Sequence, residues 1–152
     1  MTSNKTIIIG LGNPILGDDG VGWKVAEGVQ AARPLLAVDY LSLGGLSLME
    51  RLIGYERVII IDAMQTGNGR NGTITTFPLS NLPDLSAGHT TAVHDTSLQT
   101  ALLLGRQMGA SLPDEIIIVA VEAEQVFDFS DELSTAVGDA VADAVTAVLE
   151  LL

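Results

Sequence analysis

Short apolar runs alternate with segments of helical periodicity along the whole chain. Residues 6–10 and 116–121 are almost entirely apolar, and residues 58–62 form a third such run that ends on a carboxylate. Runs of this kind are typical of strands buried in a parallel sheet. The other expected elements are strands at 36–43 and 73–77 and helices at 21–32, 46–53 and 94–108, with a last helix that starts at Ser130.

Strands that alternate with helices predict an α/β fold. We expect a three-layer sandwich around a mostly parallel sheet of about five strands, with a phosphorylase/hydrolase-like architecture. The 152 residues, of which 47% are hydrophobic, are enough for one folded domain that spans residues 1–152. No apolar stretch approaches the roughly 20 residues of a membrane-spanning helix, and the first residues lack a signal-peptide pattern. We therefore expect a cytoplasmic protein that is monomeric and does not bind membranes.

Charge and residue usage narrow the possible functions. Seven Lys and Arg stand against nineteen Asp and Glu, which gives a net charge of −12 and disfavours nucleic-acid binding. The chain has no cysteine, so thiolate nucleophiles and Cys-based metal sites are excluded. Imidazole chemistry is limited to two residues, His89 and His94.

Three side chains are expected at the carboxyl edge of the predicted sheet, where open parallel sheets bind ligands. Asp19 follows the first strand, Asp62 ends the third, and His94 opens a helix. Two carboxylates and one imidazole suit a divalent cation of borderline softness. Each residue alone also has a structural interpretation: Asp19 and its neighbour Asp18 as caps, Asp62 as a turn residue, and His94 as a helix-start histidine.

The glycine-rich turn by itself allows other interpretations. Residues 10–14 read Gly-Leu-Gly-Asn-Pro, but Ile15 stands where a dinucleotide-binding fingerprint has its third glycine. Peptidyl-tRNA hydrolase is an esterase with a similar opening. It normally has a glycine after that proline and a histidine shortly downstream, and this chain has neither. The net charge of −12 also disfavours tRNA.

Several motifs resemble the maturation endopeptidases of [NiFe] hydrogenases. The resemblance begins with residues 10–14 and 17–22, continues in 56–63, and extends through His94 with Leu98 to Val121-Glu122. It implies an enzyme that removes the carboxy-terminal extension of the hydrogenase large-subunit precursor after nickel insertion. It also implies that Asp19, Asp62 and His94 are the metal-contacting and catalytic residues.

We expect the nickel to arrive on the precursor, because a cysteine-free chain offers no soft-ligand site that would hold it permanently. An alternative from another class is a non-catalytic adaptor that binds the precursor or the nickel without cleaving anything.

Overall fold

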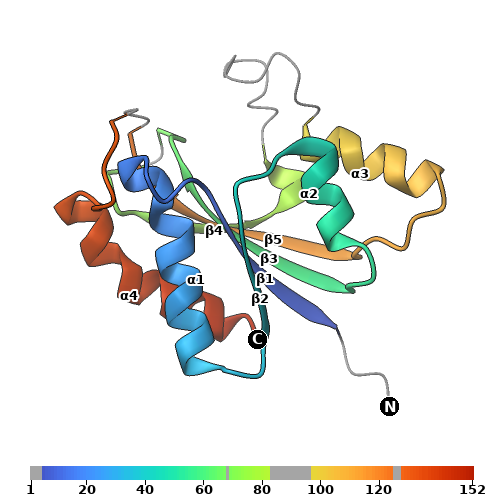
Figure 1. Ribbon diagram of the computed structural model, residues 1–152, viewed down its shortest axis with the longest axis horizontal. Helices are drawn as coiled ribbons and strands as arrows, with labels where there is room; N and C mark the ends of the chain where they lie inside the picture. The colour runs from blue at the N-terminus through green and yellow to red at the C-terminus, as the bar shows by residue number, and fades with distance from the viewer. Residues whose placement is uncertain (1–4, 68, 83–96, 125–127) are drawn as a thin grey trace.

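The computed structural model describes residues 5–67, 69–82, 97–124 and 128–152. Strands and helices alternate along these residues (Figure 1). The strands are β1 (Thr6–Leu11), β2 (Ala37–Leu41), β3 (Arg57–Met64), β4 (Ile74–Pro78) and β5 (Glu115–Glu122). The helices are α1 (Val21–Ala32), α2 (Gly45–Leu52), α3 (Leu98–Gln107) and α4 (Thr135–Glu150), with short 3-10 turns η1 (Gly17–Gly20) and η2 (Leu79–Asn81).

The five strands form one sheet in the order β2-β1-β3-β5-β4. The first four are parallel to one another, and β4 pairs with β5 antiparallel at the edge. This confirms the predicted mostly parallel sheet. The chain moves outward from β1 to β2 and then crosses to β3 on the other side of β1, so the topological switch point lies between β1 and β3. Ligands bind at such a point in open α/β sheets.

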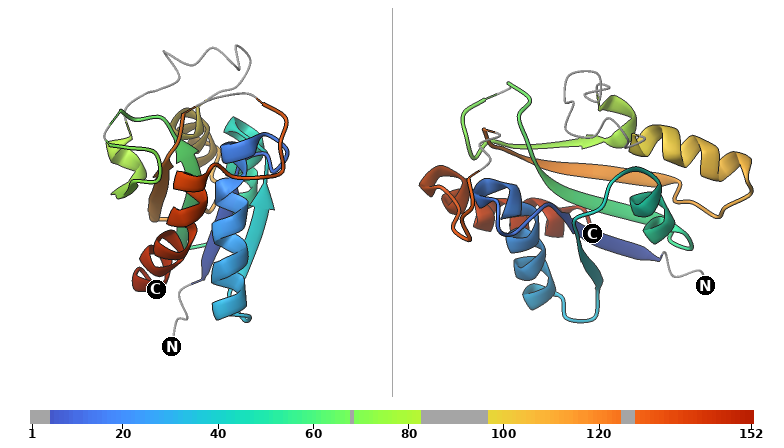
Figure 2. Two further views of the ribbon diagram at one scale, coloured as in Figure 1. Left: turned by 90° about the vertical axis from the view of Figure 1, so that its left-hand side faces the viewer. Right: turned by 45° about the horizontal axis from the view of Figure 1, so that its top comes forward.

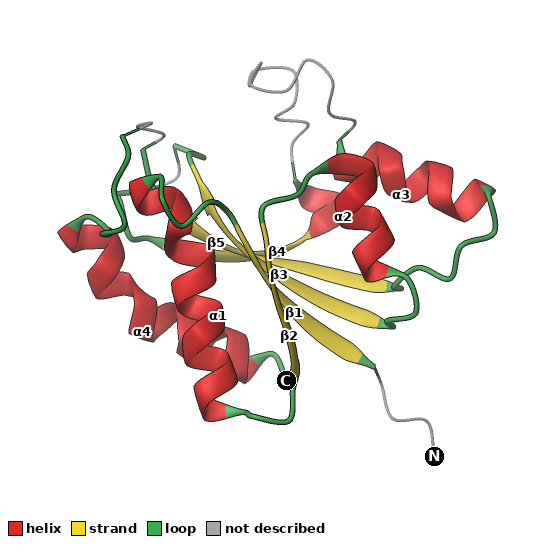
Figure 3. Cartoon of the chain, viewed as in Figure 1, coloured by secondary structure: helices red, strands yellow, loops and turns green. Residues whose placement is uncertain are grey.

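Helices cover both faces of the sheet, which gives the predicted three layers (Figure 3). One apolar core joins the sheet to α2 and α3, and the other joins it to α1 and α4. Alternate residues of β3 serve the two cores: Val58 and Ile60 face one, and Ile59 and Ile61 face the other. This double burial explains why the strand is apolar without interruption.

Two predicted helix starts are wrong. The last helix begins at Thr135 with Ser134 as its N-cap, so Ser130 is not the cap. The helix predicted from His94 begins at Leu98, where the Ser97 hydroxyl accepts the N–H of Thr100 at 3.2 Å. Serine and aspartate favour many turn positions, so sequence alone does not identify which of several neighbouring polar residues caps a helix. No described helix is long and apolar enough to span a membrane.

Candidate functional site

The turn between β1 and α1 holds Asp19 in place. The backbone N–H of Asn13 donates to the Asp19 carboxylate at 2.9 Å, and the N–H of Ile15 donates to the Asn13 side chain at 3.1 Å. Gly12 has a φ of +141°, and a Cβ there would lie 2.0 Å from the Asp19 carbonyl oxygen. The glycine in this turn is therefore required by the close approach of two backbone segments.

Helix α1 also reaches this edge through a glycine. A Cβ on Gly22 would lie 2.4 Å from the carbonyl oxygens of both Leu11 and Ile61. Only a residue without a side chain lets the first turn of α1 sit this close to β1 and β3. The glycines on either side of the two aspartates thus bring Asp19 close to the end of β3.

The adjacent aspartates have different roles. Asp18 accepts the Ser134 backbone N–H at 2.7 Å and the Ser134 hydroxyl at 2.8 Å, and Ser134 is the N-cap of α4. Asp18 therefore ties the η1 turn to the start of a helix more than one hundred residues later in the chain. This contact confirms a structural role for Asp18, although the helix that it serves is α4.

Asp62 lies within β3, where its backbone pairs with Ala120 of β5. The strand continues for two residues beyond it, so Asp62 does not end the strand as expected. Alternation along β3 places Asp62 on the same face as Ile60, toward α2 and α3. The residue as a whole is half-buried.

The two carboxylates interact electrostatically. Desolvation raises the pKa of Asp62 well above its ordinary value, and the negative charge of Asp19 raises it further. Burial also raises the pKa of Asp19, against the opposing effect of the Asn13 N–H bond. The switch point therefore holds two carboxylates whose neighbourhood disfavours their simultaneous ionisation.

The third predicted ligand, His94, lies outside the described residues, as does His89. Among the residues that are described, no group of three or more metal-ligating side chains is gathered. The structure thus brings Asp19 and Asp62 together, and the full trio stays a prediction. Helix α3 runs opposite to the following strand β5 (Figure 1). The amino end of α3 therefore lies toward the carboxyl edge of the sheet.

Comparison with known proteins identifies the family. The family model for hydrogenase maturation protease matches residues 42–151. The chain belongs to this family. Among curated relatives, it is 26% identical over 149 residues to the hydrogenase expression/formation protein HoxM of Cupriavidus necator, covering 96% of this chain and 73% of that protein. HupD of Thiocapsa roseopersicina is 24% identical over 151 residues, which cover 97% of this chain and 67% of HupD.

Solved structures show the same fold. The hydrogenase maturating endopeptidase HybD from Escherichia coli superposes with a TM-score of 0.76 at 22% identity, over 97% of this chain and 91% of HybD. HycI from Thermococcus kodakarensis gives a TM-score of 0.70 at 19% identity, over 98% and 92% of the two chains. The resemblance drawn from the motifs is confirmed, and the protein is an endopeptidase that processes the hydrogenase large subunit.

Sequence reasoning missed Glu122 as part of this edge of the protease. Glu122 is 6% exposed and ends β5. Its carboxylate accepts the backbone N–H groups of Thr66 at 2.9 Å and Gly67 at 3.2 Å, and also the Thr66 hydroxyl. It thereby fixes the loop that follows β3 and Asp62. A carboxylate directly after a wholly apolar strand was the signal that could have revealed it.

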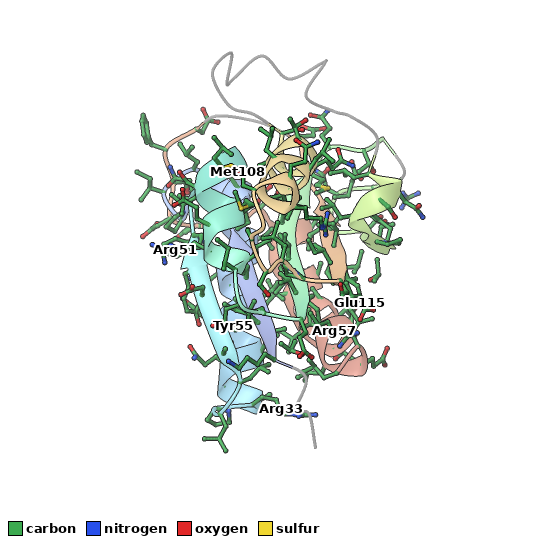
Figure 4. The ribbon with its side chains drawn as sticks, turned by 90° about the vertical axis from the view of Figure 1, so that its right-hand side faces the viewer. Arg33, Arg51, Tyr55, Arg57, Met108 and Glu115 are labelled. Atoms are coloured by element: carbon green, nitrogen blue, oxygen red, sulfur yellow. The ribbon has the colours of Figure 1, made fainter. Side chains whose placement is uncertain are left out.

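A large cavity among the described residues lies at the opposite end of the sheet. It has a volume of about 900 Å³, and its lining comes from the amino ends of strands and the loops beside them, including Lys5, Arg33, Tyr55 and Arg57. Figure 4 shows Arg57 of β3 beside Glu115 of the adjacent strand β5. Neither Asp19 nor Asp62 lines this cavity, so its size does not locate the chemistry.

Proposed function

We propose that this protease removes the carboxy-terminal extension of the large-subunit precursor after nickel insertion, and that Asp19, Asp62 and His94 contact the precursor-bound nickel. The observation that carries this proposal is the carboxylate pair at the switch point between β1 and β3. We further propose that residues 1–152 act as one domain, as a monomer that meets the precursor transiently in the cytoplasm.

The repulsion between the two carboxylates suits a site in which the substrate supplies the neutralising cation. At neutral pH a desolvated Asp62 beside Asp19 is unfavourably charged. A divalent cation placed between them would neutralise this repulsion and take the place of a proton. Precursor with bound nickel would therefore dock more tightly than precursor without it, and cleavage would report that the metal has been inserted.

The ligand types suit a metal that is held mainly by the precursor. Two carboxylates and an imidazole bind nickel less strongly than a set containing thiolates, and this chain has no cysteine. His94 precedes the first residue of α3 by only four positions. Because the amino end of α3 lies toward the carboxyl edge, the chain length is compatible with an imidazole ligand there.

The same geometry offers two routes to hydrolysis of the peptide bond. Nickel could polarise the attacking water, or a carboxylate such as Asp62 could accept its proton. The raised pKa of Asp62 makes it a stronger base than an ordinary aspartate. In both routes the carboxylates act on a scissile bond that the precursor's metal centre has positioned.

The test is precursor cleavage followed by gel and mass spectrometry, with nickel-loaded and nickel-free precursor as substrates. We expect the separate substitutions Asp19→Ala, Asp62→Ala and His94→Ala each to lower cleavage at least about 100-fold. The exposed Asp143→Ala on α4 is the matched control and should cleave normally. Unchanged processing by all three site variants would refute the assignment. Binding by the wild-type protein without loss of a carboxy-terminal peptide would favour the adaptor.

A further inference from the structure

Two large apolar side chains are exposed beside the Asp19 turn. Ile15 is 55% exposed and Phe129 is 84% exposed. They belong to segments more than one hundred residues apart in sequence, which lie side by side at the carboxyl edge (Figure 2). We call this pair of residues the apolar lip.

Backbone hydrogen bonds fix the two segments of the lip. The N–H of Gly17 donates to the Ser130 carbonyl at 2.8 Å, and the N–H of Ser130 donates to the Ile15 carbonyl at 2.9 Å. Leu16 and Ser130 thus form a parallel bridge. Ile15 and Phe129 directly precede the two bridged residues, so the bridge places their backbones next to each other.

Further bonds connect the lip to the carboxylates. Asn13 links Ile15 to Asp19, because its side chain accepts the Ile15 N–H and its own N–H donates to the Asp19 carboxylate. On the other side, Asp18 holds Ser134 through two hydrogen bonds. The lip and the candidate catalytic carboxylate therefore form one connected unit.

Exposure of these side chains does nothing for the stability of the free protein. The backbone that carries both residues is held by hydrogen bonds, so little backbone conformational entropy would be lost when a partner covers them. The turn that carries Ile15 also holds the Asp19 carboxylate through the Asn13 N–H, so a substrate segment bound at Asp19 would lie within one turn of Ile15. The occupant that this geometry favours is accordingly the substrate.

We propose that Ile15 and Phe129 bind apolar side chains of the large-subunit precursor next to the scissile bond. This inference rests on the proposed function. The lip makes contacts that are equal in the ground state and the transition state, since it contributes no group that reacts. Its loss should therefore raise KM and leave kcat unchanged.

The experiment is steady-state cleavage of nickel-loaded precursor by wild type, Ile15→Ser, Phe129→Ser and Phe129→Leu. We expect KM to rise about tenfold for each serine variant and to return toward wild type in Phe129→Leu, with kcat within about twofold throughout. The control is Leu35→Ser, which changes a fully exposed apolar residue at the opposite end of the sheet and should leave both constants unchanged. Thermal melts of these exposed variants should match wild type.

Several results would overturn the lip proposal. An unchanged KM in both serine variants would do so, and so would a fall in kcat with KM constant. It would also fail if Phe129→Ser converted a dimer to a monomer in light scattering without altering KM, because the lip would then cover a second copy of the chain. If wild type binds the nickel-loaded precursor without cleaving it, the proposed function fails separately. The lip is then tested by the dissociation constant, which should rise about tenfold in the same variants.

Discussion

The two ends of the mostly parallel sheet differ in how their charged side chains are paired. At the amino end, Arg57 of β3 donates to Glu115 of β5 at 2.8 Å, an ordinary ion pair. At the carboxyl end of the same strand, the charged neighbour that raises the pKa of Asp62 is another carboxylate, Asp19. One strand therefore begins at a compensated pair of charges and ends near a pair of like charges.

The distribution of cations follows the same division. Three of the seven Lys and Arg side chains line the cavity at the amino end, together with one carboxylate. The lining residues therefore carry a formal charge of +2, although the net charge of the whole chain is −12. Among the described residues, neither Asp19 nor Asp62 forms an ion pair with a lysine or arginine. The carboxyl edge therefore carries an electrostatic cost to stability that the amino end does not, as expected if the proposed site needs these carboxylates for function.

The largest effect should come from removing the charge of Asp62. Asp62→Asn keeps the size of the side chain but cannot serve as an anionic ligand or base. We expect precursor cleavage to fall at least about 100-fold, while the free energy of unfolding at pH 7 rises on the order of 1–2 kcal/mol. Cleavage assays and urea denaturation measure the two effects. A variant that loses both activity and stability would contradict the trade-off.

The stability gain of Asp62→Asn should depend on pH with a definite sign. The folded-state pKa of Asp62 lies above the ordinary value of 3.8, so folding favours its protonated form. The penalty is absent below that ordinary value and grows as pH rises through the folded-state pKa. The difference between variant and wild type should therefore be close to zero at about pH 3.5 and largest at neutral pH. A difference that shrinks with rising pH would refute this account.

The next effect concerns Glu122, a buried carboxylate at the carboxyl edge that is compensated by hydrogen bonds. Glu122→Ala removes the acceptor that the N–H groups of Thr66 and Gly67 use. We expect a loss of about 2–4 kcal/mol in unfolding free energy, measured by urea denaturation. The control is Glu124→Ala, whose side chain is exposed two residues later and should cost less than about 0.5 kcal/mol. Equal effects of the two substitutions would show that Glu122 does not fix the loop.

A smaller loss is expected for Asp18→Ala. This substitution removes both hydrogen bonds to Ser134 at the start of α4, which should cost about 1–2 kcal/mol. Cleavage by Asp18→Ala should fall far less than cleavage by Asp19→Ala, because Asp18 faces the helix cap. Thermal unfolding and the cleavage assay together check this division of roles. It fails if the two alanine variants are equally inactive.

The smallest effect is expected at the amino end. Glu115 is 54% exposed in its side chain and Arg57 is 19% exposed, so solvent screens their ion pair. A double-mutant cycle of Arg57→Ala and Glu115→Ala should give a coupling energy of about 0.2–1 kcal/mol by urea denaturation. Cleavage should be unchanged in all three variants. A coupling above about 2 kcal/mol would remove the contrast between the two ends.

Local patterns were enough to predict the strands, the layers and Asp19 and Asp62 as partners. Apolar runs such as 58–61 are buried on both faces, and this leaves an unambiguous signal in the sequence. The alternation of strands and helices alone predicted that both aspartates lie at one edge of the sheet, because the carboxyl ends of parallel strands share that edge. Helix starts were predicted less well, since Ser130 and Ser134 are equally good caps when taken as isolated residues.

Long-range contacts decided the rest. The partner of Asp18 is more than one hundred residues away, and so is the bridge that aligns Ile15 with Phe129. The sequence by itself determined the α/β class, the family and the two carboxylates of the candidate site, because these depend on periodicity and on short motifs. Only the tertiary structure decided that Asp18 holds a helix cap, that Glu122 fixes a loop, and that desolvation and the charge of Asp19 raise the pKa of Asp62. Those roles arise from distances between side chains, which no local pattern encodes.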